Sequence, residues 1–457
     1  MRTISYSTAL DLLLSLPDFE RRLDRSELPD RGLTNTLTLM SRLGNPHTLV
    51  PAIHVAGTKG KGSTATMIAS VLKAEGYQVG LFTSPHLHSF RERIQLNGKP
   101  VSEKEFAQLV EMVWPHRVEI SNQREWAPPM RSVFEMLTGM AFLYFAQKNV
   151  DFAVLEVGLG GTLDATNICK PVVTVITSLS LDHTEILGNT LTMIAEQKTG
   201  IAKSQVPLVV GPQAPEALKV VRRVAKEKGV PLVDVSASYH WALVRESPKK
   251  QSFEVVGLQD KYDLHMSLVG THQRENAATA VASLETLRSL GYPLSNASLR
   301  RGFHQVRLPG RLEVLQSRPL VVADGAHNPY SIRCLSSALP TIFPYNGVVL
   351  VIGCGRGHDI VGMIRELKDL PLEAIIATCS RHPSARSAPE LSEAFSGFGV
   401  PLREIAGVDV ALREALQRAS HENLILVTGS LFVAAEAREF FLGIPRETYS
   451  WTSFPVN

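Results

Sequence analysis

A glycine-rich segment near residue 60 has the composition of a phosphate-binding loop. It lies between an apolar run and a helical pattern and reads Gly57-Thr58-Lys59-Gly60-Lys61-Gly62-Ser63-Thr64. Backbone N–H groups in such a loop, with the N-terminus of the next helix, form a cradle for phosphate. Lys61 is placed to reach the β- and γ-phosphates of a nucleotide, and a hydroxyl of the loop could lie near Mg²⁺. Glycine turns are more often structural, and Gly62 departs from the general G-x-x-x-x-G-K-[ST] pattern, but the order strand, loop, helix favours nucleotide binding.

Three later polar residues could also do chemistry. Glu156 ends a hydrophobic run, at the carboxyl end of an expected strand, where α/β proteins place their sites. A solvent-facing carboxylate is an equal alternative for it. His183 follows Asp182 in a polar turn, and imidazole nitrogen is not a preferred Mg²⁺ ligand. Lys198 is expected in the last turn of a helix, where its charge also suits the helix dipole.

The loop and several later segments together resemble the folylpolyglutamate synthase family. The match includes the extra glycine of the loop and runs in order, at fitting spacing, from about residue 30 to Leu431. Its further segments are Thr83-Ser84-Pro85-His86-Leu87, Arg91-Glu92-Arg93-Ile94, Leu155-Glu156-Val157-Gly158-Leu159-Gly160-Gly161, Leu163-Asp164-Ala165-Thr166-Asn167, Leu181-Asp182-His183-Thr184-Glu185, Gly270-Thr271-His272-Gln273 with Asn276, Pro309-Gly310-Arg311, and Asp324-Gly325-Ala326-His327-Asn328-Pro329. The ordered set is far more specific than any one segment.

The resemblance implies a relative of the bacterial cell-wall Mur ligases, with a nucleotide-binding domain and a C-terminal α/β domain that closes over ATP and substrate. It implies that ATP phosphorylates a carboxylate and that the amine of L-glutamate attacks the acyl phosphate, releasing ADP and phosphate. The carboxylate would belong to dihydropteroate, to a reduced folate, or to both. Phosphoryl transfer of this kind needs Mg²⁺ and cations around the γ-phosphate.

The resemblance also implies roles for single residues. Ser84, Glu156 and His183 match the magnesium ligands of the family. Besides the loop, contacts to ATP are implied for Asn276, Arg311 and Asp324. Catalytic roles are implied for Lys61, Lys198 and His327, the last of them near the nucleotide. Folate contacts are implied for Phe134 and Asp164, although Phe134 with Glu135 equally suits a core aromatic beside a capping carboxylate.

Lys198 corresponds to a lysine that many of these ligases carry as a carbamate. Carbon dioxide adds only to a neutral amine, and burial near Mg²⁺ lowers the pKa of a lysine. The anion that forms would help to hold a second Mg²⁺. The alternative is an ordinary helix lysine.

The sequence departs from the family at Thr162, where most relatives carry arginine in Gly-Gly-Arg-Leu-Asp-Ala-Thr-Asn. In the family this loop borders the pteridine side of the folate pocket. Loss of the guanidinium could therefore change which folate binds. The sequence does not decide whether the acceptor is dihydropteroate, a reduced folate, or both.

Short β-branched runs alternate with helical patterns, which predicts an α/β fold with parallel strands joined by helices. Capping boxes at Ser102–Glu105 and Ser132–Glu135 open two of the helices. Strands are expected at residues 53–55, 79–82, 152–157, 172–176, 207–210, 230–235, 320–323, 348–352, 374–378 and 424–427, with short antiparallel strands between about 236 and 268. We predict a P-loop nucleotide-binding domain over 1–305, with a mostly parallel sheet and a small antiparallel subregion, and a smaller Rossmann-like α/β domain over 306–457.

The composition is that of a soluble globular protein of two or three domains, with 457 residues, 44% hydrophobic and 20% charged. A formal charge of +3 gives no reason to expect a nucleic-acid or anionic-membrane partner. Four scattered cysteines form no C-x-x-C pair, and no apolar run reaches transmembrane length. We expect a cytoplasmic protein whose partners are small-molecule substrates, and the resemblance implies a monomer.

Other functions remain open. The enzyme could be a folylpolyglutamate synthase only, or a Mur-type ligase that adds an amino acid to another carboxylate. A Mur-type enzyme would usually lack Gly62 and carry a UDP-sugar domain before its loop, whereas only about fifty residues precede Gly57. A third possibility is a P-loop kinase, which glutamate-independent phosphoryl transfer to a hydroxyl would support, or a binding protein without activity. The inactive protein is disfavoured by the retained residues, which are Lys61, Ser84, Glu156, His183, Lys198 and Asp324.

Overall fold

The computed structural model describes residues 4–16, 32–122 and 132–448. The chain forms two compact units. Unit 1 comprises Met1–Val244, Ser252–Met266 and Gln273–Val306, and unit 2 comprises Arg245–Gln251, Ser267–His272 and Arg307–Asn457. Domain boundaries at 1–305 and 306–457 remain our proposal, and the two short inserted segments of unit 2 were not foreseen from the sequence.

Unit 1 is built on an eight-stranded sheet with the order β4-β3-β2-β5-β1-β6-β7-β8. The strands are β1 (Ala52–Ala56), β2 (Val79–Phe82), β3 (Ile94–Leu96), β4 (Lys99–Pro100), β5 (Phe152–Glu156), β6 (Pro171–Ile176), β7 (Leu208–Val210) and β8 (Leu232–Asp234). All neighbours pair in parallel except at β3 and β4. Because β1, β2, β5 and β6 are parallel, the loops that follow them leave from one edge of the sheet.

Helices cover both faces of this sheet, as its fully buried strands β1 and β5 require. Those of unit 1 are α1 (Tyr6–Leu14), α2 (Gly32–Arg42), α3 (Lys61–Glu75), α4 (Glu103–Asn122), α5 (Val133–Gln147), α6 (Thr184–Leu187), α7 (Leu191–Thr199), α8 (Pro215–Glu227), α9 (Val235–Ser238), α10 (Thr271–Ser289) and α11 (Asn296–Gln305). Helix α11 packs tightly on α3 at Gly302, where an added Cβ would lie 2.5 Å from Val71 Cα. None of the described helices is long and apolar enough to cross a membrane.

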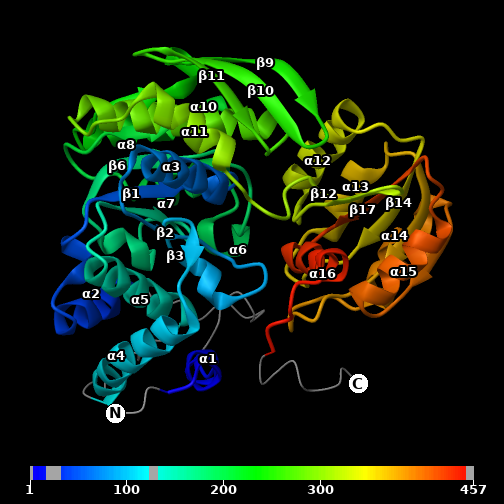
Figure 1. The fold of residues 1–457 in the computed structure, drawn as a ribbon, viewed down its shortest axis with the longest axis horizontal. Helices are drawn as coiled ribbons and strands as arrows, with labels where there is room; N and C mark the ends of the chain where they lie inside the picture. Colours follow the sequence, from blue (N-terminus) through cyan, green and yellow to red (C-terminus); the bar gives the residue numbers. More distant parts are fainter. Residues whose placement is uncertain (1–3, 17–31, 123–131, 449–457) are drawn as a thin grey trace. The chain divides into compact units, whose positions relative to one another are not determined.

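A three-stranded sheet lies beside α10 and α11 (Figure 1). Its strands are β9 (His240–Ser247), β10 (Lys250–Val256) and β11 (Lys261–Met266). A buried carboxylate, Glu285 of α10, accepts hydrogen bonds from the hydroxyls of Tyr239 (2.7 Å) and Tyr262 (2.8 Å) and from the N–H of Leu258 (2.9 Å). These bonds hold the small sheet and α10 together, and α10 carries Asn276 towards the phosphate loop.

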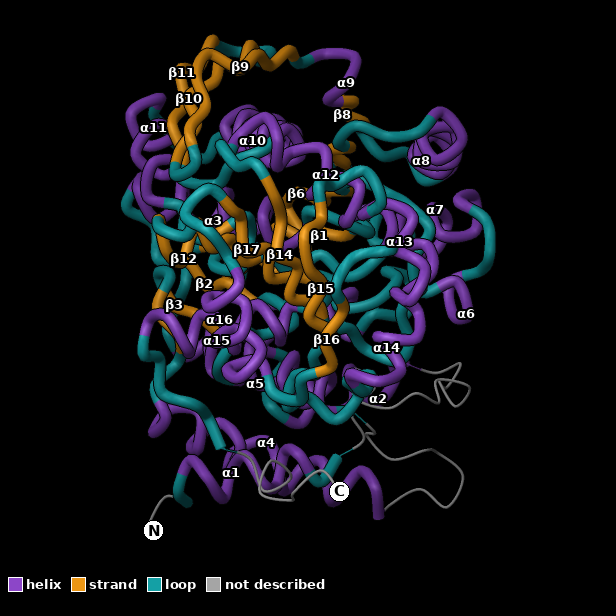
Figure 2. The backbone as a smooth tube through the Cα atoms, turned by 90° about the vertical axis from the view of Figure 1, so that its right-hand side faces the viewer, coloured by secondary structure: helices purple, strands orange, loops and turns teal. Residues whose placement is uncertain are grey.

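Unit 2 contains a six-stranded sheet with the order β12-β13-β17-β14-β15-β16, parallel except at β12. Its elements are β12 (Glu313–Ser317), β13 (Leu320–Ala323), α12 (Pro329–Ile342), β14 (Gly347–Ile352), α13 (Ile360–Leu367), β15 (Leu372–Ala377), α14 (Ala388–Phe395), β16 (Leu402–Glu404), α15 (Val408–Arg418), β17 (Asn423–Thr428) and α16 (Leu431–Leu442). Figure 2 shows β14, β15 and β16 side by side, with α14 next to them. Apolar clusters fill both faces of the sheet.

The predicted fold class is confirmed: a mostly parallel sheet, a small extra sheet and a second α/β domain are all present. The elements that the sequence patterns missed include β3, β4, α11, β12 and β16. Helix α11 contains Gly302, which lowers helix propensity but permits the close contact with α3. Strand β16 has three residues, too few for an alternation of apolar and polar residues to be recognised in the sequence.

Candidate active site

The phosphate loop leaves the end of β1 and enters α3, and its two sharp turns require glycine. Gly57 and Gly60 have φ values of +150° and +84°. A Cβ on Gly57 would lie 1.9 Å from Thr177 Oγ1, and one on Gly60 would lie 2.1 Å from Asn276 Oδ1. No larger residue fits either position without displacing these neighbours. Asn276, expected from the sequence to contact ATP, is therefore beside the loop.

The N–H groups of the loop divide into two sets. Those of Thr58 and Lys59 donate to Ser178 O at 2.9 and 3.1 Å, so they brace the loop against the segment after β6. Contacts of Thr58 and Lys59 with ATP stay a prediction, and their N–H groups are directed to Ser178 O in this structure. The first intrahelical bond runs from Thr64 N to Gly60 O (2.9 Å). The N–H groups of the first turn of α3, from Lys61 to Ser63, thus precede the helical ladder, at the end of a helix that favours negative charge.

Glu156, Ser84 and Gly62 meet at the carboxyl edge of the sheet. Strands β2 and β5 pair with Phe82 opposite Leu155, so the residues just beyond them are neighbours. The Ser84 N–H donates to Glu156 Oε2 at 3.1 Å. The Glu156 side chain is buried, and a Cβ on Gly62 would lie 3.3 Å from Glu156 Oε2. The structure therefore sets a carboxylate directly against the first turn of α3.

His183 lies in a turn that is tied to the phosphate loop. Its neighbour Asp182 accepts a salt bridge from Lys59 Nζ at 2.9 Å, with both side chains largely buried. His183 has a left-handed backbone (φ 49°) at the start of α6, and its N–H donates to Asp182 Oδ1 (3.2 Å). Across the described parts of the chain, no three His, Cys, Asp or Glu residues gather as a metal site. The magnesium assignment of Ser84, Glu156 and His183 thus stays a prediction.

Lys198 is buried against the same loop. Its Nζ donates to Gly57 O at 2.9 Å, and the residue is 3% exposed. Burial is the main cause that lowers the pKa of Lys198 to about 7, and the nearby charge of Lys61 lowers it further, while Asp182 raises it. The amine is therefore poised to lose its proton near neutral pH, as the sequence-based argument required.

The Asp164 carboxylate organises the loop that follows β5. Its Oδ2 accepts the N–H groups of Gly158 and Leu159, both at 3.0 Å, and its Oδ1 accepts the N–H (3.0 Å) and the hydroxyl of Thr166. Burial raises the pKa of Asp164, while these hydrogen bonds act in the opposite direction. The carboxylate, 6% exposed, therefore shapes its own loop, and the contact of Asp164 with folate stays a prediction.

Phe134 packs on the same loop from the start of α5. A Cβ on Gly158 would lie 2.6 Å from the Phe134 ring, and the rings of Phe134 and Phe82 are 5.6 Å apart. The capping box is present, with Ser132 and Glu135 exchanging hydrogen bonds of 3.1 Å. The half-buried Phe134 ring therefore forms one wall next to the loop that Asp164 shapes.

Thr162, the departure from the family pattern, holds the end of the helix that carries Lys198. Its N–H and its hydroxyl both donate to Gln197 O, at 2.9 and 3.0 Å. A Cβ on Gly200 would lie 1.9 Å from Thr162 Oγ1, so Gly200 makes room for the hydroxyl. Sequence reasoning missed this contact, although the glycine at position 200 was a signal for close approach.

Arg311, Asp324 and His327 belong to unit 2 and cluster around the end of β13. Asp324 accepts the N–H groups of Leu312 and Ala326, both at 2.8 Å. Burial raises the pKa of Asp324, and Arg311 acts against that rise. His327 Nδ1 lies 2.7 Å from the carbonyl oxygen of Gly325. Their roles in ATP binding and catalysis stay predictions.

Sequence reasoning also missed basic residues beside His327. The ring of His358 lies 5.0 Å from that of His327. Arg356, two residues before His358, is exposed, and its carbonyl oxygen accepts Arg386 Nη2 at 3.0 Å. These residues follow β14 and β15, at the carboxyl edge of the sheet. The glycines of the segment Gly353-Cys354-Gly355-Arg356-Gly357-His358 directly after a buried strand were the available signal.

Comparison with known proteins gives consistent matches over almost the whole chain. Residues 55–284 match the Mur ligase middle domain, and residues 310–431 match the Mur ligase glutamate ligase domain. The chain is 37% identical to the dihydrofolate synthase/folylpolyglutamate synthase of Bacillus subtilis, over 89% of this chain and 94% of the relative. It is 34% identical to the protein of that name from Escherichia coli, over 91% and 92%.

Comparison with solved structures also finds proteins of this group. The Mycobacterium tuberculosis folylpolyglutamate synthase complexed with ADP superposes with a TM-score of 0.86 at 32% identity, covering 97% of this chain and 99% of that one. An E. coli structure in complex with DHPP and ADP gives a TM-score of 0.83 at 30% identity, covering 96% and 98%.

Proposed function

The chain belongs to the Mur ligase family, in its dihydrofolate synthase/folylpolyglutamate synthase group, and we propose that it joins L-glutamate to dihydropteroate, to reduced folates, or to both. It is an ATP-dependent amide ligase. The terminal phosphoryl group of ATP passes to the acceptor carboxylate, giving an acyl phosphate and ADP. The amine of glutamate then attacks the acyl carbon, phosphate leaves, and a proton is lost as the amide forms.

The main support for this proposal is the position of the Glu156 carboxylate beside the N-terminus of α3. Glu156 is buried beside Gly62 and accepts the N–H of Ser84. A buried carboxylate next to the N-terminus of α3 suits a site in which a cation and phosphates share one place, because neither charge is then left unpaired.

The residues present fit Mg²⁺ in part. Carboxylate and hydroxyl oxygens, from Glu156 and Ser84, are the donors that Mg²⁺ prefers, whereas the imidazole of His183 is a less usual one. These three residues would hold the ion. When bound, Mg²⁺ neutralises charge on the phosphoryl group in transfer.

The side chains of the loop supply the remaining positive charge. Lys61 Nζ lies 3.5 Å from Thr58 O, a long contact that the side chain can leave for a nucleotide phosphate. Lys59 is held by Asp182 instead, so it fixes the turn that contains His183. Lys61 therefore binds and orients the phosphates, and Lys59 positions the loop.

Lys198 is a carbamate in the active enzyme under this proposal. Its neutral amine adds CO₂ to form an N–CO₂⁻ group and releases one proton. The pKa of about 7 for Lys198 leaves a large neutral fraction at physiological pH. The new anion sits among Lys61 and Lys59, which compensate its charge, and would help to hold a second Mg²⁺.

Unit 2 supplies cations for the two carboxylates of L-glutamate. His327, His358 and the exposed Arg356 lie at the carboxyl edge of its sheet, where α/β domains bind their ligands. Arg356→Ala is expected to raise KM for glutamate by about 10-fold and to leave KM for ATP within 2-fold, since it removes one charged contact. An unchanged KM for glutamate would exclude Arg356 from the site.

The function is tested by ADP release from the purified chain with Mg-ATP and L-glutamate, with dihydropteroate compared with tetrahydrofolate as acceptor. Turnover with both establishes both activities. Turnover with tetrahydrofolate alone establishes a folylpolyglutamate synthase only. With neither acceptor, given intact ATP binding, the folate assignment fails and a Mur-type ligase acting on another carboxylate takes its place. Phosphoryl transfer to a hydroxyl without glutamate would mark a kinase. A cytoplasmic location and a monomeric state stay predictions.

A further inference from the structure

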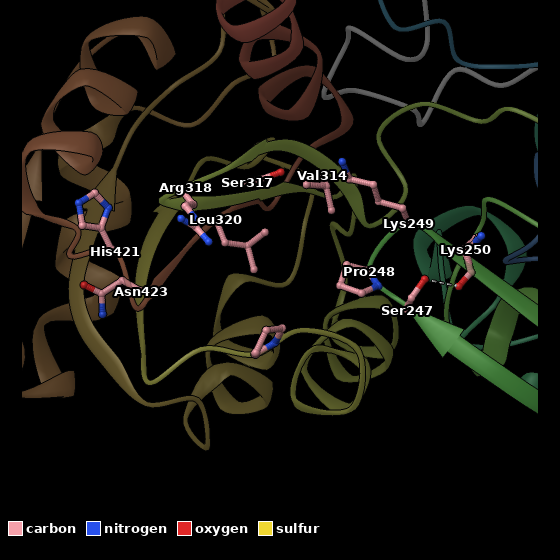
Figure 3. Close-up of a pocket in the computed structure, with 11 residues that line it drawn as sticks. Ser247, Pro248, Lys249, Lys250, Val314, Ser317, Arg318, Leu320, His421 and Asn423 are labelled. Atoms are coloured by element: carbon pink, nitrogen blue, oxygen red, sulfur yellow. Dashed lines mark hydrogen bonds between the residues drawn. The ribbon is translucent and has the colours of Figure 1, made fainter.

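Unit 2 contains a cavity of about 550 Å³ that the ligase chemistry does not use (Figure 3). Its apolar floor includes Val314 and Leu320, and its rim carries Lys249, Lys250, Arg318 and His421. The volume is in the range of small-molecule sites. Figure 3 shows Ser247, Pro248 and the two lysines at the end of the β9–β10 hairpin, and Val314, Ser317, Arg318, Leu320, His421 and Asn423 on strands and loops of the C-terminal sheet.

The hairpin end is held to the rest of unit 2 by two hydrogen bonds. Glu246 Oε1 accepts the Gly270 N–H at 2.8 Å, and Gln251 Nε2 donates to Leu268 O at 2.6 Å. Between these two partners, Val269 is buried in the core cluster that also contains Leu312 and Val322. The lysines at the hairpin end are thereby fixed over the cavity.

The cavity rim has an uncompensated positive charge. Within the described residues, no carboxylate forms a salt bridge with Lys249, Lys250 or Arg318, whereas exposed arginines elsewhere do pair, such as Arg222 with Asp234 at 2.7 Å. Glu422, next to His421, instead accepts the Asn346 amide at 2.6 Å. Several like charges around one hollow strengthen the local field and attract anions.

Most of the cavity lining, including Leu320 and Asn423, lies at the opposite edge of the sheet from Asp324. Leu320 is the first residue of β13, and Asp324 directly follows its last. A strand of four residues is roughly 13 Å long. Leu320 is therefore distant from Asp324, whereas Val314, which pairs with Val322 of β13, lies nearer to it.

We propose that this cavity binds a small organic anion with two or more carboxylate or phosphate groups. The anionic groups would pair with Lys249, Lys250 and Arg318, and the carbon chain would lie on Val314 and Leu320. The proposal does not rest on the ligase reaction, because binding here requires neither nucleotide nor turnover.

The test is calorimetric titration of the full chain, in EDTA, with a γ-linked triglutamate and with fructose 1,6-bisphosphate. Both are organic polyanions, and they separate carboxylate from phosphate recognition. Lys61→Ala serves as the background in every sample, so that binding at the phosphate loop is weakened equally. Hydrogen exchange of the hairpin end is followed in the same samples, because an occupied cavity should slow it.

The decisive variant is Lys249→Ala, Lys250→Ala and Arg318→Ala together. Its control, Lys99→Ala, Lys104→Ala and Lys226→Ala, removes three exposed charges from unit 1. We expect at least one probe to bind the background chain with a sub-millimolar Kd, to bind the decisive variant about 10-fold or more weakly, and to bind the control within 2-fold. Binding of one probe only supports the site and identifies its anion. Absence of binding by both probes, equal loss in the control, or unchanged binding in the decisive variant overturns the proposal.

Discussion

Gly62 lies directly against the carboxylate of Glu156: a Cβ on Gly62 would lie 3.3 Å from Glu156 Oε2. This separation is shorter than most Cβ contacts, so any side chain at position 62 would press on the carboxylate. The glycine directly after Lys61, which departs from the general phosphate-loop pattern, thus has a structural reason. It lets the first turn of α3 approach the end of β5.

Gly62→Ala should separate activity from stability. Alanine has the higher helix propensity, so the free energy of unfolding should stay the same or rise by up to about 1 kcal/mol. Displacement of the Glu156 carboxylate should lower kcat by about 10-fold or more. ADP release and urea denaturation measure the two effects. Gly397→Ala, at a glycine with open space around it, is the control. Full activity in Gly62→Ala would show that Glu156 tolerates the shift.

Lys61→Ala should abolish ATP turnover while the chain stays folded. The lysine is expected to carry charge to the β- and γ-phosphates, and its contact to Thr58 O is too long to stabilise the fold. ADP release and circular dichroism are the measurements. Lys73→Ala, at an exposed position on the same helix, should retain activity. Near-normal turnover in Lys61→Ala would refute our placement of the site.

The activity should depend on the protonation of Lys198. Because the folded-state pKa is lowered from 10.5 to about 7, the amine is mostly charged below pH 7 and neutral above it. At fixed dissolved CO₂, kcat/KM should fall as the pH drops through about 7. The unfolded chain binds the extra proton between about pH 7 and 10.5, so this residue makes the free energy of unfolding rise with pH in that window. Lys198→Met should lose this rise of the free energy of unfolding with pH.

Lys198→Ala should be inactive and regain some activity with added short carboxylates. A small carboxylate can enter the space left by the side chain and supply the anion that the carbamate provides. The measurement is ADP release against acetate or formate concentration, with chloride as the ionic-strength control. Wild-type activity in Lys198→Ala without additive would end the carbamate proposal.

Asp164→Asn should lower the free energy of unfolding, because the carboxylate accepts hydrogen bonds from its own loop. A carboxylate that only contacted a ligand would give little loss. The amide replaces one acceptor oxygen by a donor that opposes backbone N–H groups, which should cost about 2–4 kcal/mol. Chemical denaturation measures this loss. Asp151→Asn is the matched control, because Asp151 is exposed and accepts a single N–H from Gln78 at 2.7 Å; it should lose less than about 1 kcal/mol. Equal losses would contradict the shaping role of Asp164.

Thr162→Arg should alter the choice of acceptor. Thr162 is exposed, so a guanidinium can extend from this position without a core clash. We expect the ratio of kcat/KM for dihydropteroate and tetrahydrofolate to change by about 10-fold, the value of one charged hydrogen bond. Thr162→Val is the control, since it removes only the hydroxyl bond to Gln197 O. A constant ratio in Thr162→Arg would mean that the residue at position 162 does not determine which acceptor is preferred.

Much of the fold and the chemistry was determined by the sequence itself. Strand β1, the loop after it and α3 were predictable because β1 is mostly apolar apart from the buried His54, and because Gly57 and Gly60 have backbone conformations that favour glycine. The ligase assignment was predictable because its motifs are local and ordered along the chain. Helix α11 was not, since Gly302 weakens its pattern and its stability comes from packing on α3.

Only the tertiary structure decided what the site residues do. Burial lowers the pKa of Lys198, whose Nζ lies against the carbonyl of Gly57, 141 residues away in sequence. The inward direction of Asp164 and the contact of Thr162 with the end of α7 depend on side-chain directions that no motif records. A sequence gives residue types and local periodicity, whereas desolvation, charge proximity and hydrogen-bond partners arise when distant segments pack.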